Sequence, residues 1–478
     1  MTTSARSRTG RLYVGLVVMA TITGMVGSLG APLVPAVAEH EDVSLRLAQW
    51  SLTATLLVGA VATPLIGGLG TGRRRRPVLL AVLGLVGIGC LLAALPLGFW
   101  GVLVGRALMG IGFGINPLAI AVARDAIPVE RQRSALAMIS LSTVLSAGLG
   151  FPVSALLADL VGVKGAFMVV ATMICATFLM AAVTVPEASS VETRDVDWTG
   201  ALLIGGGTLG VLLAITQVSQ HGVGSPHVWV PASIGGLVLV AAVLWLLRRR
   251  IPLVDLRLAV SPGVLGANIA AFLGGVGMYL IMVTTLVLVQ ADPQASGGLG
   301  QSVTVGGLMM VPYALTSVVG ARFALWVAER MSPDLLLPLG CVGFALANLS
   351  LWAAHDELWQ VVVAMGIGGI GAGMTFNAIP WLMARFVPLE QTASAIGFNV
   401  VLRFIGFSIG SALSAMLLLQ FSGGADHPVE RGFQISSLVG VGVSLVGAVL
   451  CLALAGPARR RAAAVTAAVA PSPLPESG

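Results

Sequence analysis

Fourteen apolar segments, each long enough to cross a lipid bilayer, recur between Leu12 and Pro457. A soluble core could not bury them, because 57% of the residues are hydrophobic and only 10% are charged, against about 25% charged residues in an average soluble domain. A helix satisfies its own backbone hydrogen bonds and needs about 20 apolar residues to span a membrane. The sequence therefore predicts an all-α polytopic membrane protein with fourteen transmembrane helices. The expected spans are residues 12–33, 47–69, 77–97, 100–122, 135–158, 165–185, 198–218, 229–247, 263–289, 303–327, 334–354, 358–382, 392–418 and 433–456.

The cations of the loops predict the orientation, because Lys and Arg are retained on the cytoplasmic side of a membrane. With the amino terminus inside, twenty of the 26 Lys and Arg residues fall in loops on the cytoplasmic side. An even number of spans places both termini in the cytoplasm, so we expect a multi-pass protein of the cell inner (cytoplasmic) membrane. These short loops account for the net charge of +6, and no basic domain indicates binding to nucleic acid.

Cysteine and histidine spacing gives no indication of a metal site. The four cysteines lie singly in expected spans, and the five histidines lie in expected outer loops. We therefore expect no metal ion, no cofactor and no enzyme. The sequence has no Gly-x-x-x-x-Gly-Lys-Ser/Thr loop and no soluble stretch that could hold a nucleotide-binding domain, which argues against an ATP-driven pump. Residues 457–478 cannot bury a core and are expected to form a disordered cytoplasmic tail.

One stretch of the sequence occurs twice. Residues 110–136 contain Gly-Ile-Gly-x-Gly, then Pro-x-Glu and Ser-Ala, and the same pattern returns in residues 369–396. The copies are eight expected spans apart, which predicts two six-helix bundles, 12–185 and 263–456, and an inserted helix pair, 198–247. Transporters are often built from such repeats, with the substrate site near the midplane where the halves meet. A chance match of Gly-rich and Ala-rich sequence is the alternative.

Five short motifs lie at the ends or inside the expected spans. They occupy residues 67–76, 106–112, 148–152, 197–200 and 252–257. By these motifs and their order, the chain resembles the major facilitator superfamily and, within it, the fourteen-helix drug:proton antiporter family. The resemblance implies an efflux transporter that works by alternating access, conferring drug resistance by antiport of drugs with protons.

The resemblance also indicates which residues act in gating. Thr71 stands where the family carries an Asp that closes a charge pair at the inner gate, so Glu329 is expected to carry that role alone. Independently of the family, the Gly and Pro residues of 148–152 permit close packing and a bend, which suits moving halves; ordinary tight packing is the alternative. The predicted gating residues are Gly67, Thr71, Arg75, Gly148, Gly150, Pro152, Glu329 and Arg330.

Polar residues inside the spans are the candidates for binding and coupling. A charge at mid-bilayer costs roughly 3 kcal/mol, so Arg403, deep in its span, is expected to line a cavity and bind an acceptor or couple to protons. A structural link to buried carbonyls is the alternative. The resemblance gives Arg106 a role in proton release or substrate contact, while single Asn and Tyr residues often serve as interhelical hydrogen bonds. The predicted substrate-binding or coupling residues are Arg106, Asn116, Tyr279, Tyr313, Asn377, Asn399 and Arg403.

No acidic residue lies at the centre of any expected span. Many relatives carry an Asp in the first helix, about nine residues before its closing Pro, and Val26 occupies that position here. The sequence nonetheless favours a secondary active transporter that exports multiple lipophilic or amphipathic small molecules from the bilayer by proton antiport, as a monomer. The alternatives are a transporter-like membrane sensor and a facilitated-diffusion carrier without proton coupling.

Overall fold

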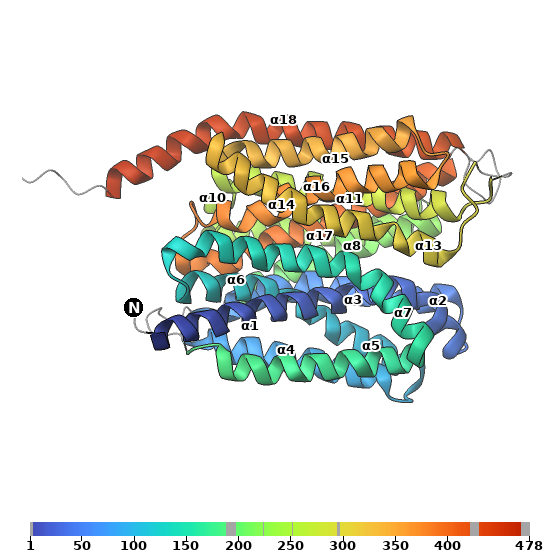
Figure 1. Cartoon of the computed structure of the whole chain (residues 1–478), viewed down its shortest axis with the longest axis horizontal. Coiled ribbons are helices and arrows are strands. Elements are labelled where there is room, and N and C mark those ends of the chain that lie inside the picture. Colours follow the sequence, from blue (N-terminus) through green and yellow to red (C-terminus); the bar gives the residue numbers. More distant parts are fainter. Residues whose placement is uncertain are drawn as a thin grey trace, which may run out of the picture.

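The computed structural model describes residues 3–187, 197–222, 224–250, 252–293, 297–420 and 430–469. These residues form helices and their connections, and most of the long helices run along one axis of the molecule (Figure 1). The elements are α1 (Thr3–Ser28), α2 (Gly30–His40), α3 (Leu45–Leu69), η1 (Gly72–Arg74), α4 (Arg75–Ala94), α5 (Gly98–Gly110), η2 (Ile111–Gly114), α6 (Ile115–Ala126), α7 (Val129–Thr184), α8 (Trp198–His221), α9 (Pro226–Arg248), α10 (Leu256–Ala259), α11 (Pro262–Gln290), α13 (Val303–Leu308), α14 (Met310–Arg330), η3 (Pro333–Leu335), α15 (Leu336–Ala353), α16 (Leu358–Met383), η4 (Leu389–Gln391), α17 (Thr392–Gln420) and α18 (Glu430–Val469).

Thirteen helical segments of the described chain are long and apolar enough to cross a membrane. The part of α7 before Gly162 supplies another long helix, because Gly162 (φ 72°, ψ 171°) breaks α7 in two. A positive φ has little steric cost for glycine, which lacks a Cβ. The two parts of α7 run in opposite directions (Figure 1), so the expected spans 135–158 and 165–185 both lie in α7. The fold is the all-α arrangement that the sequence predicts.

Several expected spans are broken rather than continuous. Span 12–33 is divided between α1 and α2, and span 100–122 contains the 3₁₀ turn η2 between α5 and α6. Helix α3 lies very close to the residue before this turn. A Cβ on Gly110 would lie only 2.2 Å from the Thr55 carbonyl oxygen of α3. The predicted disordered tail requires correction, since α18 continues to Val469. Residues 459–469 are rich in alanine, the best helix former, and residues 470–478 lie outside the described part of the chain.

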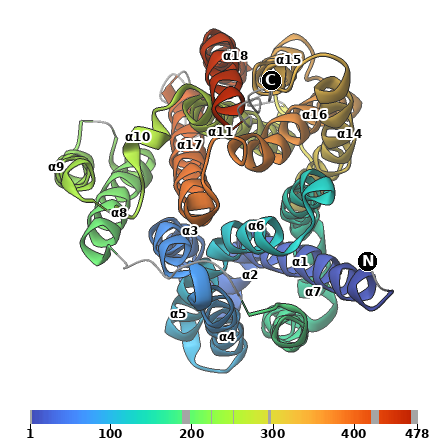
Figure 2. The ribbon, with the colours of Figure 1, turned by 90° about the vertical axis from the view of Figure 1, so that its left-hand side faces the viewer.

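The helices form two groups that face each other (Figure 2). Helices α1 to α7 pack among themselves and make the amino-terminal group, and α11 to α18 make the carboxyl-terminal group. The peripheral pair, α8 and α9, lies beside them, with α8 against α3 and α17. This grouping follows the predicted division into two six-helix bundles and an inserted pair, whose boundaries remain a proposal.

The loops that carry most arginines gather at one end of the molecule. Arg75 at the start of α4 forms an ion pair with Asp125 at the end of α6 (3.2 Å), and Arg76 donates to the carbonyl oxygen of Ala182 near the end of α7 (2.6 Å). Arg124 donates to the carbonyl oxygen of Ala384, just after α16 (2.8 Å). We call this region the arginine-rich end, and the other end of the helices the opposite end.

Candidate functional site

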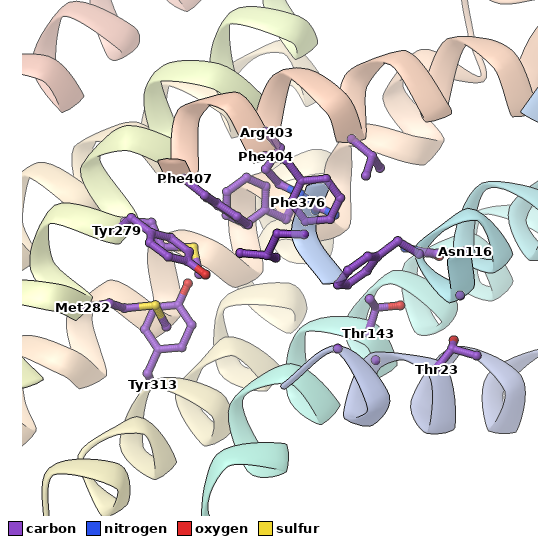
Figure 3. Close-up of a pocket in the computed structure, with 17 residues that line it drawn as sticks. Thr23, Asn116, Thr143, Tyr279, Met282, Tyr313, Phe376, Arg403, Phe404 and Phe407 are labelled. Carbon is purple, nitrogen blue, oxygen red and sulfur yellow. The ribbon is translucent and has the colours of Figure 1, made fainter. Parts of the chain in front are cut away.

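A cavity of about 160 Å³ lies between the two groups of helices. Its walls come from α1, α3, η2, α6 and α7 on one side and from α11, α14, α16 and α17 on the other, so neither group forms it alone (Figure 3). The lining residues are Thr23, Gly24, Gly27, Leu56, Gly112, Phe113, Asn116, Thr143, Met278, Tyr279, Met282, Tyr313, Phe376, Val400, Arg403, Phe404 and Phe407.

One face of α17 supplies a large part of the aromatic wall. Val400, Arg403, Phe404 and Phe407 follow the spacing that places residues on one side of a helix, and all four line the cavity. Phe407 stacks on Tyr279 of α11, with ring centroids 4.4 Å apart. Across the boundary between the groups, Phe404 meets Phe113 of η2 edge to face at 4.8 Å. The wall is therefore continuous from one group to the other.

Arg403 is the one charged residue among the described residues that line the cavity. Its guanidinium carbon lies 5.2 Å from the ring centroid of Phe376 and 5.9 Å from that of Phe407, within the range of cation–π attraction. Its Nε atom is buried without a hydrogen-bond partner, and we find no ion pair of Arg403 within the described ranges. The aromatic faces thus contact the charge but offer its N–H groups no acceptor atom.

Three other predicted site residues, Asn116, Tyr279 and Tyr313, also line this cavity. The two tyrosine hydroxyl groups are turned toward the same part of it (Figure 3). The Tyr313 hydroxyl oxygen and the Asn116 Oδ1 atom are both buried, and neither has a hydrogen-bond partner in the described part of the chain. The structure therefore brings four of the seven predicted binding or coupling residues together around one space.

The remaining three predicted residues, Arg106, Asn377 and Asn399, are not among those that line the cavity. Asn377 donates to the Gly373 carbonyl oxygen of its own helix (3.0 Å). Asn399 joins α17 to α11 by donating to the carbonyl oxygen of Ala267 and to Asn268 Oδ1, both at 3.0 Å. Asn399 thus makes an interhelical hydrogen bond, the alternative that the sequence left open, whereas the bond of Asn377 stays within α16.

Arg106 is almost fully buried inside the amino-terminal group. Its Nη1 atom donates to the carbonyl oxygen of Val26 (3.4 Å) and contacts Met109 Sδ (3.6 Å). Its Nε and Nη2 atoms have no partner among the described residues. Arg106 thus donates to the backbone of Val26. By the resemblance given above, Val26 stands where many relatives carry an acid.

Sequence reasoning missed most of the aromatic and sulfur-containing wall. Phe376, Phe404 and Phe407 looked like ordinary apolar residues of a span, as did Met278 and Met282. The helical spacing of Phe404 and Phe407 could have revealed them. Phe404 lies three positions before Phe407, which lies four positions after Arg403, and residues three or four positions apart are neighbours on a helix face. Met278 and Met282 of α11 and Phe376 of α16 are far apart in the sequence, and the three-dimensional structure is needed to see that they line the same cavity.

Two further arginines close the boundary between the groups at the arginine-rich end. Arg124, near the end of α6, donates to the carbonyl oxygens of Ala384 (2.8 Å) and Val387 (2.9 Å) and to the Thr392 hydroxyl. Arg133, in the first turns of α7, donates to the Leu325 carbonyl oxygen (3.5 Å) and lies over the Trp381 ring, 4.9 Å from its centroid. These contacts join the amino-terminal group to α14, α16 and α17, and the sequence did not single out either arginine.

The sequence profile of the Major Facilitator Superfamily matches residues 16–296 and 267–476, which together cover most of the chain. The chain belongs to the Major Facilitator Superfamily. It is therefore a multi-pass integral membrane protein that belongs to a family of transporters rather than of enzymes. The fourteen-helix drug:proton antiporter branch is consistent with its helices and with several of its relatives.

Relatives within the superfamily are named for different substrates, or for none. An uncharacterised superfamily transporter of Mycobacterium tuberculosis is 24% identical over 78% of this chain and 54% of its own length, so the chain spans about half the length of that relative. A uridine/deoxyuridine transporter of Lactococcus lactis is 25% identical over 72% of each chain. A putative multidrug resistance protein, MdtD of Shigella flexneri, is 24% identical over 82% of each chain.

Solved structures support the superfamily fold. The crystal structure of the human organic anion transporter TETRAN superimposes with a TM-score of 0.64, at 16% sequence identity, over 93% of this chain and 99% of that chain. At this identity the likeness concerns the fold alone.

The superfamily motif at residues 67–76 lies at the arginine-rich end. Gly67 packs so closely on α17 that a Cβ would lie 2.8 Å from the Ala393 carbonyl oxygen. Thr71, in place of the family Asp, donates to the Gly68 carbonyl oxygen of its own turn (3.3 Å). The buried Arg75 is held by Asp125 and by the backbone oxygens of Gly70 and Ala121. The motif thus contributes a tight backbone contact between the groups.

The other predicted gating residues lie on α7 and α14. Gly148, Gly150 and Pro152 belong to the part of α7 before Gly162. Glu329 and Arg330 are exposed at the end of α14, where Arg330 lies over the Trp326 ring (5.6 Å). Across the described ranges, Glu329 forms no ion pair. Arg124 and Arg133, in contrast, contact the other group at this end, and the gating role of Glu329 stays a prediction.

Proposed function

We propose that this transporter exports amphipathic or lipophilic small molecules across the cytoplasmic membrane by alternating access, in exchange for protons. The observation that carries this proposal is the cavity shared by the two groups of helices, which Arg124 bridges at the arginine-rich end. A site built from both groups can change its exposure when the groups rock against each other, which is how transporters with repeated halves work.

The distribution of charge supports the direction of export. The arginine-rich end is assigned to the cytoplasm because cytoplasmic loops retain Lys and Arg, and both termini lie there in this assignment. In this assignment, Arg124 and Arg133 bridge the two groups of helices at the cytoplasmic end. Opening would require the contacts of Arg124 and Arg133 with the carboxyl-terminal group to break.

The chemistry of the cavity favours amphipathic over strongly polar substrates. Its walls are mostly aromatic, aliphatic or thioether side chains, and burial of apolar ligand surface contributes about 25 cal/mol per Å². A nucleoside would bring many hydrogen-bonding groups that these walls could not satisfy. We therefore place this protein nearer to its relatives of the multidrug type than to the uridine/deoxyuridine transporter.

A second candidate is facilitated diffusion without proton coupling. One observation favours it: in the described part of the chain, no residue that lines the cavity is a carboxylic acid. Proton coupling commonly uses an acid within the membrane, and the proposed antiport would have to use a group outside the lining.

Purified protein in liposomes distinguishes the two candidates. An imposed pH gradient should drive concentrative uptake of amphipathic test compounds, and collapse of the gradient by an ionophore should abolish it. Downhill transport that is indifferent to pH gradient and voltage would establish facilitated diffusion. Empty liposomes and liposomes that contain the Arg124→Ala variant serve as controls for passive permeation and for the integrity of the gate.

A further inference from the structure

We infer that the cavity selects amphipathic organic anions, with Arg403 binding the carboxylate or an equivalent acidic head group. This inference rests on the proposed transport of amphipathic compounds and adds that the preferred compounds are negatively charged. It follows from the charges of the residues that line this cavity.

The first argument is charge balance. Arg403 carries a permanent positive charge, and the other residues that line the cavity are uncharged. Two aromatic rings contact its guanidinium, but its Nε atom has no hydrogen-bond partner within the described ranges. A cationic ligand would add a second positive charge in a poorly screened space, whereas an anion would neutralise the first. The cavity therefore favours negative ligands.

The second argument is the hydrogen-bonding capacity that is left free. Thr23 and Thr143 already donate to backbone oxygens of their own helices, Met19 (2.7 Å) and Ile139 (3.0 Å). Tyr313, in contrast, has a buried hydroxyl without a partner among the described residues. Arg403 and Tyr313 thus supply unused donors, and a carboxylate, which offers two acceptor oxygens, suits a guanidinium fork.

The third argument concerns the body of the ligand. Next to the charge, Phe404, Phe407, Met278 and Met282 form an apolar surface with aromatic faces for stacking. The volume of about 160 Å³ is close to that of an engineered apolar cavity, about 150 Å³, that binds benzene in another protein. The space beside Arg403 can therefore hold one aromatic ring.

Three ligands of nearly equal shape test the inference: 4-tert-butylbenzoate, its neutral methyl ester and the cationic 4-tert-butylbenzylamine. Binding is measured by isothermal titration calorimetry on the full chain in nanodiscs of zwitterionic phosphatidylcholine, so that no anionic lipid competes. Wild-type protein should bind the benzoate about tenfold or more tightly than the ester or the amine, since hydrogen bonds to charged groups contribute at least this factor.

Variants of Arg403 show whether that residue is responsible. Arg403→Gln should remove the preference for benzoate and leave the affinity for the ester within about threefold, and Arg403→Lys should retain part of the preference because a lysine keeps the charge but loses the planar fork. Arg322→Gln is the matched control, since Arg322 is exposed on α14 and outside the cavity lining. It should bind all three ligands like wild type.

Two results would overturn the inference. One is an ester or amine that binds the wild type as tightly as the benzoate, and the other is a benzoate preference that survives in Arg403→Gln. Neither result depends on a gradient. If the inference fails but liposomes still export neutral or cationic compounds, the proposed function is retained. If the protein binds benzoate selectively but shows no gradient-driven transport, the anion site is supported and proton antiport is not.

Discussion

At the scale of single residues, Arg403 and Arg106 hold their charges inside the helical spans in different ways. Arg403 faces a cavity and two aromatic rings, whereas Arg106 is enclosed by the amino-terminal group with two nitrogen atoms that have no partner in the described part of the chain. A buried charge without a counter-charge is destabilising. We therefore expect that Arg106 does not stabilise the fold.

This interpretation predicts the effect of Arg106→Met. Methionine fills a similar volume without the cost of burying a charge, so the free energy of unfolding should be unchanged or higher by about 1–3 kcal/mol. Thermal unfolding in detergent can be followed with a thiol-reactive dye, because Cys90, Cys341 and Cys451 are buried. Arg322→Met provides an exposed control. A clear fall in the unfolding temperature of Arg106→Met alone would mean that Arg106 stabilises the fold.

At the scale of elements, one carboxylate holds the peripheral pair together. Asp197 is buried at the start of α8 and accepts hydrogen bonds from the backbone N–H of Gly200 (2.9 Å), Trp245 Nε1 (3.0 Å) and the backbone N–H of Leu253 (3.3 Å). The carbonyl oxygen of Leu253 in turn accepts from the hydroxyl of Ser394 on α17. The chain of contacts links α8 and α9 to the arginine-rich end.

Asp197→Asn should therefore destabilise the protein. An amide can replace only one carboxylate oxygen as an acceptor, so at least one of the three donors loses its partner, at a cost of about 1–3 kcal/mol. Asp255→Asn is the matched control, because a single oxygen of Asp255 accepts both of its hydrogen bonds, from the N–H groups of Arg257 and Leu258, and asparagine caps helices as well as aspartate does. Equal melting temperatures for the two variants would refute the proposed link.

At the scale of the whole molecule, the sequence predicted the helices much better than the site. Apolar length is a property of each segment, so the spans and the reversal near Gly162 could be predicted locally. Which residues line the cavity depends, in contrast, on how segments that are distant in the sequence pack together. Nothing in the local sequence distinguishes Tyr279, which lines the cavity, from Asn399, which bonds to Asn268. The missed contacts of Arg124 are of the same kind, since its acceptors lie about 260 residues away along the chain.

Alternating exposure of the shared cavity is the central claim, and pairs of spin labels test it most directly. One pair, at Glu130 and Pro388, spans the arginine-rich end, and the other, at His40 and Glu357, spans the opposite end; all four residues are exposed. Pulsed electron paramagnetic resonance should show two distances for each pair, and Arg124→Ala should lengthen the first while it shortens the second. One fixed distance at each end, the same in wild type and Arg124→Ala, would contradict the account.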